Sequence, residues 1–150
     1  GEHAETLFAA IAAAKDAGVL LSQVGAAEAK HRLLLAAAAL KEARSLEDVA
    51  TLQKSLTEAR EAGVPSEVVE DARAHLRRLV AARELRAAMQ DEDAFALHKA
   101  LDEASDAGVE AIDLEAASTR LRRLIAARSL AEASEARDCE GLQLAVAEAQ

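Results

Sequence analysis

The tripeptide Ala-Gly-Val occurs three times in this chain at a constant interval. Its glycines are Gly18, Gly63 and Gly108, so that neighbouring copies lie 45 residues apart. The apolar positions around each copy recur in the same register, which identifies an internal repeat. The sequence therefore predicts a single repeat domain over 1–150, with units of approximately 1–45, 46–90 and 91–135 and a partial fourth unit over 136–150. In such a chain each unit buries its apolar face mainly against its neighbours, without one central core.

Each Ala-Gly-Val predicts the end of a helix. A segment rich in Ala and Leu precedes every copy, and glycine takes the left-handed backbone conformation just past a helix end without a steric clash at Cβ. The valine that follows each glycine can pack back onto the last turn of the helix, an apolar contact that often accompanies such a helix end. Gly18, Gly63 and Gly108 are therefore assigned as structural turn residues.

Two helices of unequal length are expected in each unit. The shorter one precedes the glycine and carries apolar residues at i, i+4 and i+7, which form one stripe on a helix. This stripe consists of Leu7, Ile11 and Ala14 in the first unit, Leu52, Leu56 and Ala59 in the second, Leu97, Leu101 and Ala104 in the third, and Leu142, Val146 and Ala149 in the fourth. The longer helix follows the glycine and has a wider stripe, which predicts contacts both with its own partner and with the next unit.

The start of each helix is marked less clearly than its end. Ser22, Ser66 and Asp113 are the predicted N-caps of the longer helices. Between a longer helix and the next short one, residues 45–48 resemble a capping box that begins at Ser45, and Asp recurs at 48, 93 and 138. These residues favour a break in the helix. Without such a break, each span between glycines would be one helix of about 60 Å, and the protein would be an elongated antiparallel bundle.

The composition predicts an all-α fold. Half of the chain is apolar, but Ala and Leu supply most of that half, Phe8 and Phe95 are the only aromatic residues, and Pro65 is the only proline. Ala and Leu are strong helix formers. Tandem helical pairs with this period resemble an α-solenoid of HEAT or armadillo length, with about seven helices here. The resemblance concerns architecture alone, and it implies a scaffolding or protein-interaction role.

The charge of the chain excludes several classes of partner. A formal net charge of −9 argues against nucleic acid, because phosphate binding needs a basic surface, and against attraction to an anionic membrane.

No apolar run approaches the 18 to 20 residues of a membrane span. Cys139 is the only cysteine, so that no intrachain disulfide can form, and a reducing intracellular compartment is the expectation.

Arginines at shared repeat positions are the candidate partner-binding residues. Arg32, Arg77 and Arg122 are 45 residues apart, and so are Arg83 and Arg128. One position per unit becomes a row along one face of a stacked array, and a row of guanidinium groups suits a carboxylate-rich or phosphorylated partner. The alternative is that these arginines pair with acids on adjacent helices, such as Glu58, Glu70, Glu103 and Glu115.

No catalytic, metal or cofactor site is predicted. His31 occupies a repeat position held elsewhere by Leu76 and Leu121, which indicates a partly buried side chain with a hydrogen-bond partner. Acidic neighbours would raise the pKa of the Cys139 thiol and reduce its reactivity. The sequence therefore predicts a non-enzymatic scaffold or interaction module within a longer repeat protein or a larger assembly, which binds a protein partner or self-associates through its terminal repeats. The alternative is a small-ligand carrier with its site between Ala-rich helices.

Overall fold

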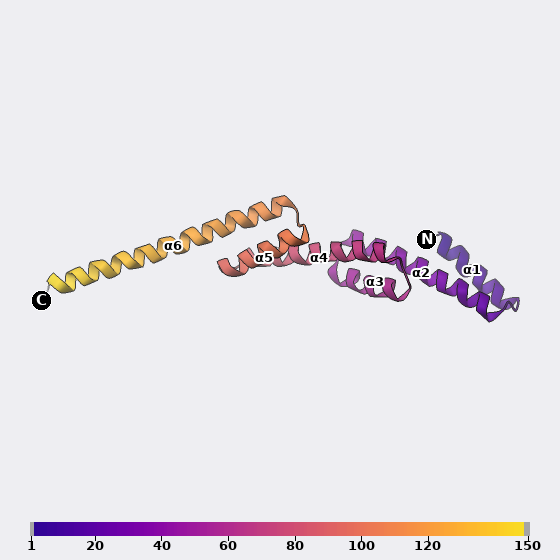
Figure 1. Ribbon diagram of the computed structural model, residues 1–150. Helices are drawn as coiled ribbons and strands as arrows, with labels where there is room; N and C mark the ends of the chain where they lie inside the picture. Colours follow the sequence, from indigo (N-terminus) through magenta and orange to yellow (C-terminus); the bar gives the residue numbers. More distant parts are fainter. Residues whose placement is uncertain (1, 149–150) are drawn as a thin grey trace. The chain divides into compact units, whose positions relative to one another are not determined.

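The computed structural model describes residues 2–148, and it describes side chains over residues 3–136. This part of the chain is helical, as predicted, and contains no strand. Its six helices are α1 (Glu2–Asp16), α2 (Leu21–Leu46), α3 (Val49–Glu61), α4 (Ser66–Ala88), α5 (Ala94–Ala107) and α6 (Ala111–Glu148) (Figure 1). The chain divides into two compact units, residues 1–80 and 81–150. Residues of α4 therefore contribute to both units.

The three glycine turns have the backbone conformation that the sequence predicts. The φ angles of Gly18, Gly63 and Gly108 are 73°, 80° and 74°, in the left-handed region. At each turn the glycine amide donates to the carbonyl three residues earlier, and the amide of the following valine donates to the carbonyl five residues earlier. These bonds satisfy carbonyls that the helix end would otherwise leave unpaired. The short helices α1, α3 and α5 therefore all end in the same way.

Aspartates at equal repeat positions begin two of the short helices. The Asp48 carboxylate accepts from the Thr51 amide at 3.0 Å, and the Asp93 carboxylate accepts from the amides of Phe95 and Ala96 at 2.9 and 3.2 Å. The capping box predicted from Ser45 is wrong, because Ser45 lies inside α2 and its hydroxyl donates to the Glu42 carbonyl. The breaks at Asp48 and Asp93 occur where the sequence predicts them.

The longer helices begin without the predicted caps. Helix α2 begins at Leu21 and α6 at Ala111, so that Ser22 and Asp113 already lie within their first turns. The residues that precede the first helical residue are Leu20, Pro65 and Glu110, and their carbonyls accept the first intrahelical amides, as at any helix start. These three residues share one repeat position but no side-chain type. At the start of α2, the Leu20 side chain makes no capping hydrogen bond.

The third junction differs from the first two. Asp138 is equivalent to Asp48 and Asp93, yet α6 continues through it to Glu148. The separate seventh helix expected over 136–150 is therefore not observed. Residues 135–137 are Glu, Ala and Arg, which favour helix strongly enough that one aspartate does not end it.

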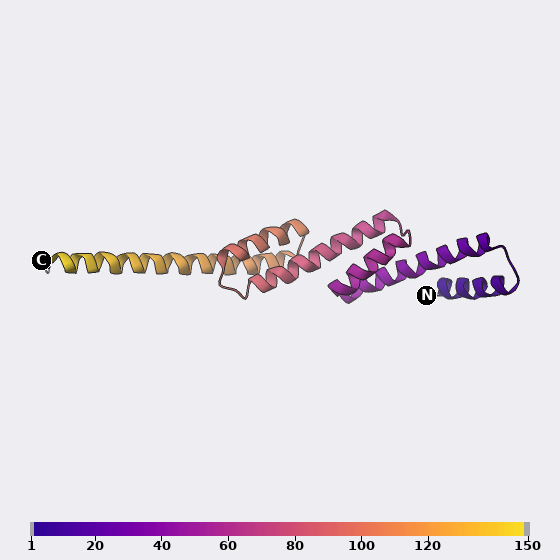
Figure 2. The ribbon, with the colours of Figure 1, turned by 90° about the horizontal axis from the view of Figure 1, so that it is seen from below.

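Two apolar cores hold the helices together, one in each unit. In the first unit α3 packs against the second half of α2 and the first half of α4; in the second, α5 packs against the end of α4 and the first half of α6 (Figure 2). The first core includes Ala36, Leu40, Leu52, Ala59 and Ala72, and the second includes the residues 45 positions later: Ala81, Leu85, Leu97, Ala104 and Ala117. The same repeat positions therefore build both cores.

Candidate interaction surfaces

The five arginines predicted to bind a partner are all exposed. Arg32 lies on α2, Arg77 and Arg83 on α4, and Arg122 and Arg128 on α6. Arg128 Nε contacts Glu132 Oε1 at 2.9 Å, within the same helix. The ion pairs among residues 3–136 include none of the other four arginines. Their guanidinium groups are exposed to solvent.

Three of the four acids that were the alternative partners of these arginines pair with other residues. Glu58 lies 3.8 Å from Lys54, Glu70 lies 2.8 Å from Arg73, and Glu103 lies 3.6 Å from Lys99. Each of these pairs joins residues three or four positions apart on one helix. Such exposed pairs contribute only a few tenths of a kcal/mol each.

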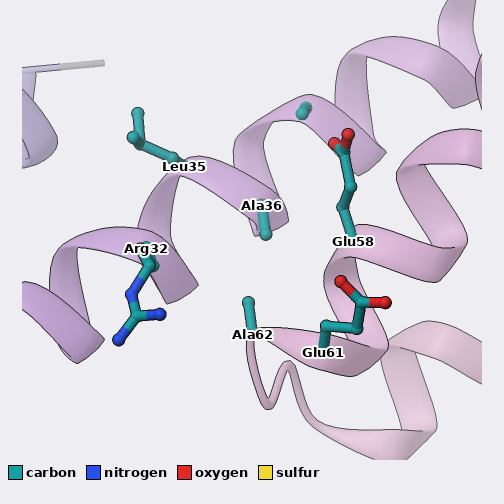
Figure 3. Close-up of a pocket in the computed structure, with 7 residues that line it drawn as sticks. Arg32, Leu35, Ala36, Glu58, Glu61 and Ala62 are labelled. Carbon is teal, nitrogen blue, oxygen red and sulfur yellow. The ribbon is translucent and has the colours of Figure 1, made fainter.

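A groove between α2 and α3 brings Arg32 near two carboxylates. Arg32 stands on the α2 side, and Glu58 and Glu61 stand on the α3 side (Figure 3). Apolar side chains from both helices line the space between them, which has a volume of about 340 Å³: Leu35, Ala36, Ala39 and Ala62. The Arg32 guanidinium points away from the two carboxylates in Figure 3. A groove with a cation on one rim and carboxylates on the other suits a peptide with an apolar side chain between charges.

Arg122 lines a different kind of groove. This second groove lies between α5 and α6 and has a volume of about 640 Å³. Most of the residues that line it are polar, among them Asp102, Ser105 and Glu115. Arg32 and Arg122 share a repeat position, but Arg32 lines a groove with the short helix that follows its own long helix. Arg122 faces the short helix that precedes α6, because α6 continues where α2 ends. The structure therefore places two equivalent arginines in unlike surroundings.

His31 packs against Phe8, a contact that the sequence does not indicate. Their ring centroids lie 5.6 Å apart, with an angle of 36° between the rings. His31 is half-buried, as predicted, but its side chain makes no hydrogen bond within residues 3–136, and the ring contact with Phe8 is what the structure shows instead. Both rings line a third groove, between α1 and α2, of about 450 Å³, together with Ala4, Leu34 and Leu35. This groove is more apolar than the other two because most of its lining consists of Phe8, Leu and Ala side chains. Phe8 has no apolar equivalent in the next two units, which have Gln53 and His98 at its repeat position.

His75 is not the exposed basic residue that its repeat position suggests. It is half-buried in α4, and its Nε2 atom is buried without a hydrogen-bond partner. The equivalent residues are Lys30 and Arg120, whose longer side chains can bring their charges to the surface. A repeat alignment alone gives no sign of the difference, because all three residues are basic.

An ion pair connects α1 to α2. Lys15 Nζ lies 2.6 Å from Glu28 Oε1. The hydrogen bond and the charge of Lys15 lower the pKa of the Glu28 carboxyl from its usual value of 4.5, burial acts in the opposite direction, and the charge of Arg32 lowers this pKa further. The equivalent pairs in the next two units are Arg60 with Arg73 and Ser105 with Ser118. This contact is therefore specific to the first hairpin.

Residues 3–136 bring no three His, Cys, Asp or Glu side chains together in a way that could hold a metal ion. Cys139 lies outside the residues whose side chains are described. Within the described part of the chain, every helix is too short or too polar to cross a bilayer.

No protein-family model matches this chain, and neither a curated protein nor a solved structure matches it.

Proposed function

We propose that this protein is a non-enzymatic helical-repeat scaffold, an α-solenoid type of module that binds a protein partner through its exposed arginines. The observation that carries this proposal is the recurrence of one packing arrangement in both cores. Equal repeat positions are buried in each core, and stacked units of this kind present equivalent surface residues in rows. The module acts through its surface and within a longer protein or a larger assembly.

The distribution of polar groups supports a surface function. Of the residues that the structure describes as buried, Ser55 alone is polar. The buried side chains therefore serve helix packing, while charged side chains lie on the outside. Arg32, Arg77 and Arg122 are exposed and take part in no ion pair among residues 3–136. A guanidinium group can bind a carboxylate in a bidentate manner, which makes these residues suited to an acidic protein segment.

The probe for this proposal is a fluorescently labelled synthetic peptide rich in Glu and Leu, whose binding is followed by fluorescence anisotropy. The variant Arg77→Glu/Arg122→Glu removes two cations from the shared position and adds two like charges. We expect its affinity for the peptide to fall about tenfold or more, which corresponds to about 1.4 kcal/mol. Binding to the wild type should also weaken with increasing salt, because exposed charges are screened.

The matched control is Arg78→Glu/Arg123→Glu. These two arginines share the neighbouring repeat position, are exposed and lie on the same two helices. The control makes the same change in net charge, so that it corrects for general repulsion of the acidic peptide. Equal loss of affinity in the two variants, or no binding by the wild type, would contradict a specific arginine surface.

The apolar groove between α1 and α2 favours a second candidate function, that of a small-ligand carrier. Phe8 and His31 line this groove with Leu34 and Leu35. Titration with an apolar fluorescent dye tests it, with Phe8→Ala as the variant and Phe95→Ala as the control. Phe95 is also exposed, at 78%, but lies on α5. A carrier site requires that Phe8→Ala, and not Phe95→Ala, weakens dye binding.

A further inference from the structure

The groove between α2 and α3 carries opposite charges on its two sides. Arg32 stands on the α2 side, which we name the basic rim, and Glu58 and Glu61 stand on the α3 side, which we name the acidic rim (Figure 3). Both helices belong to the same compact unit, and they contribute to one apolar core. This core therefore holds the two rims in place.

The rim charges do not neutralise one another. Among residues 3–136, the ion pairs include neither Arg32 nor Glu61. Glu58 has one long contact, of 3.8 Å, with a lysine on its own helix. The Arg32 guanidinium points away from the two carboxylates (Figure 3). The three rim side chains are exposed, so that a partner can reach each of them.

The space between the rims is apolar. It is lined by Ala36 and Ala39 from α2, by Ala62 from α3, and by Leu35, which is 49% exposed. Its volume of about 340 Å³ lies within the range of ligand pockets, roughly 300–1,000 Å³. Leu35 also lines the apolar groove between α1 and α2. The two grooves therefore meet at this side chain, and apolar side chains of a partner can lie along both.

The signs of the rim charges recur in the sequence. Forty-five residues after the three rim residues, in the same order, the chain has Arg77, Glu103 and Asp106. The apolar lining does not recur in full, because Glu84 takes the place of Ala39. The charge pattern thus belongs to the repeat, whereas its combination with this lining is specific to the groove between α2 and α3.

We propose that this groove binds a helix of a protein partner whose apolar stripe has acidic residues along one flank and basic residues along the other. An amphipathic helix places residues i, i+3, i+4 and i+7 into such a groove. Its acidic flank lies along the basic rim, where Arg32 can bind a carboxylate in a bidentate manner, and its basic flank lies along the acidic rim. A helix with one sign of charge on both flanks would meet a like charge at one rim. This inference rests on the proposed function and names its partner.

Three synthetic peptides of about 20 residues, long enough to form a helix, test this partner. They share one leucine stripe and differ only in their flanks: Glu on one flank and Lys on the other in the mixed peptide, Glu on both in the acidic peptide, and Lys on both in the basic peptide. At about 0.15 M salt, where distant charges are screened, the wild type should bind the mixed peptide about tenfold more tightly than either other peptide. No binding of the mixed peptide up to about 1 mM, or no preference for it, would overturn the proposal.

Reversing one rim at a time should change which peptide binds best. Arg32→Glu makes both rims acidic and should move the preference to the basic peptide. Glu58→Lys/Glu61→Lys makes both rims basic and should move it to the acidic peptide. The variant with all three changes should prefer the mixed peptide again, because the helix can then dock in the opposite direction. The order of affinities staying as in the wild type in both single-rim variants would contradict the groove.

The matched controls make the same changes in charge away from the groove. Lys30→Glu alters the net charge as Arg32→Glu does, and Asp16→Lys/Glu47→Lys alters it as reversal of the acidic rim does. The control positions are exposed and do not line this groove. Both controls should keep the preference for the mixed peptide. A control that moved the preference as its rim variant does would overturn the proposal, because general charge would then select the peptide.

The outcomes separate this inference from the proposed arginine surface. If Arg77→Glu/Arg122→Glu loses the acidic peptide of the earlier test but the wild type has no preference for the mixed peptide, the groove is overturned and the arginine surface stands. If the preference follows the rim variants and Arg77→Glu/Arg122→Glu changes no affinity, the groove stands and the arginine surface falls. Self-association of the wild type that Arg32→Glu abolishes in sedimentation velocity would make a second copy the occupant and overturn the proposal.

Discussion

Three glycines with a left-handed backbone decide where the short helices end. An added Cβ would meet nothing within 4 Å at Gly18 or Gly63, so that no steric contact with other residues requires glycine there. The requirement comes from φ alone, which is 80° at Gly63. A left-handed conformation costs a residue with a side chain roughly 1 kcal/mol. The repeat of glycine every 45 residues is therefore a repeat of backbone conformation.

Gly63 and Gly25 form a matched pair for testing this explanation. Gly25 lies inside α2 and, like Gly63, has open space around its Cβ position. Gly63→Ala should lower the free energy of unfolding by about 1 kcal/mol, because alanine resists positive φ. Gly25→Ala should raise it by roughly 0.5–1 kcal/mol, because alanine favours a helix interior. Urea denaturation measures both, and a change of the same sign in the two variants would contradict the assignment.

At the scale of the helix, the pairing of α1 with α2 depends on one charged contact that the other hairpins do not have. The Lys15–Glu28 pair joins these helices at 2.6 Å, and Lys15 lowers the pKa of Glu28. A carboxyl whose pKa is lower in the folded state stabilises the fold above its unfolded pKa. This contribution is lost as the pH falls through the folded pKa.

The difference in melting temperature between the wild type and Glu28→Gln isolates this contribution. It should favour the wild type at neutral pH and shrink as the pH falls below the usual carboxyl value of 4.5. Lys15→Gln removes the partner, so that Glu28→Gln in that background should show much less pH dependence. A wild-type advantage that stays constant between neutral pH and pH 3 would mean that the pair does not stabilise the hairpin.

Helix bounds show which features could be predicted from the sequence. Ends marked by glycine were predictable because positive φ selects one residue type. The starts of α2 and α6 were not, because Leu20 and Glu110 precede their first residues in place of the Ser, Thr, Asp or Asn that marks an N-cap in a sequence. Asp48 and Asp93 begin helices, but Asp138 does not. The effect of an aspartate depends on the helix propensity of its neighbours and on tertiary packing, which a single position does not reveal.

The candidate surfaces were predictable only in part for a related reason. A repeat alignment predicts that Arg32 and Arg122 are equivalent, and both are exposed. It does not predict that one lines a groove with Glu58 and the other a groove with Asp102, because that depends on which helices are neighbours. The Phe8–His31 contact departs from the repeat at both positions and therefore has no counterpart in the other units.

At the scale of the whole molecule, the same packing of a short helix between two long helices forms two cores. The third equivalent surface, on α6, consists of Ala126, Leu130 and Ala133, which are exposed. Equal sequence positions then have unequal energetic roles. Leu40, Leu85 and Leu130 are one residue type at one repeat position, but they are 1%, 1% and 73% exposed. Local propensity is the same for all three leucines, so that any difference in their contribution to stability comes from tertiary packing.

The most direct test is the free energy of unfolding of Leu40→Ala, Leu85→Ala and Leu130→Ala, measured by urea denaturation at a protein concentration too low for association. The first two variants should each lose about 2–5 kcal/mol, as expected for a leucine removed from a packed core. Leu130→Ala should change stability by less than about 0.5 kcal/mol, as expected for an exposed position. Comparable losses in all three variants, or small losses at Leu40 and Leu85, would contradict this account.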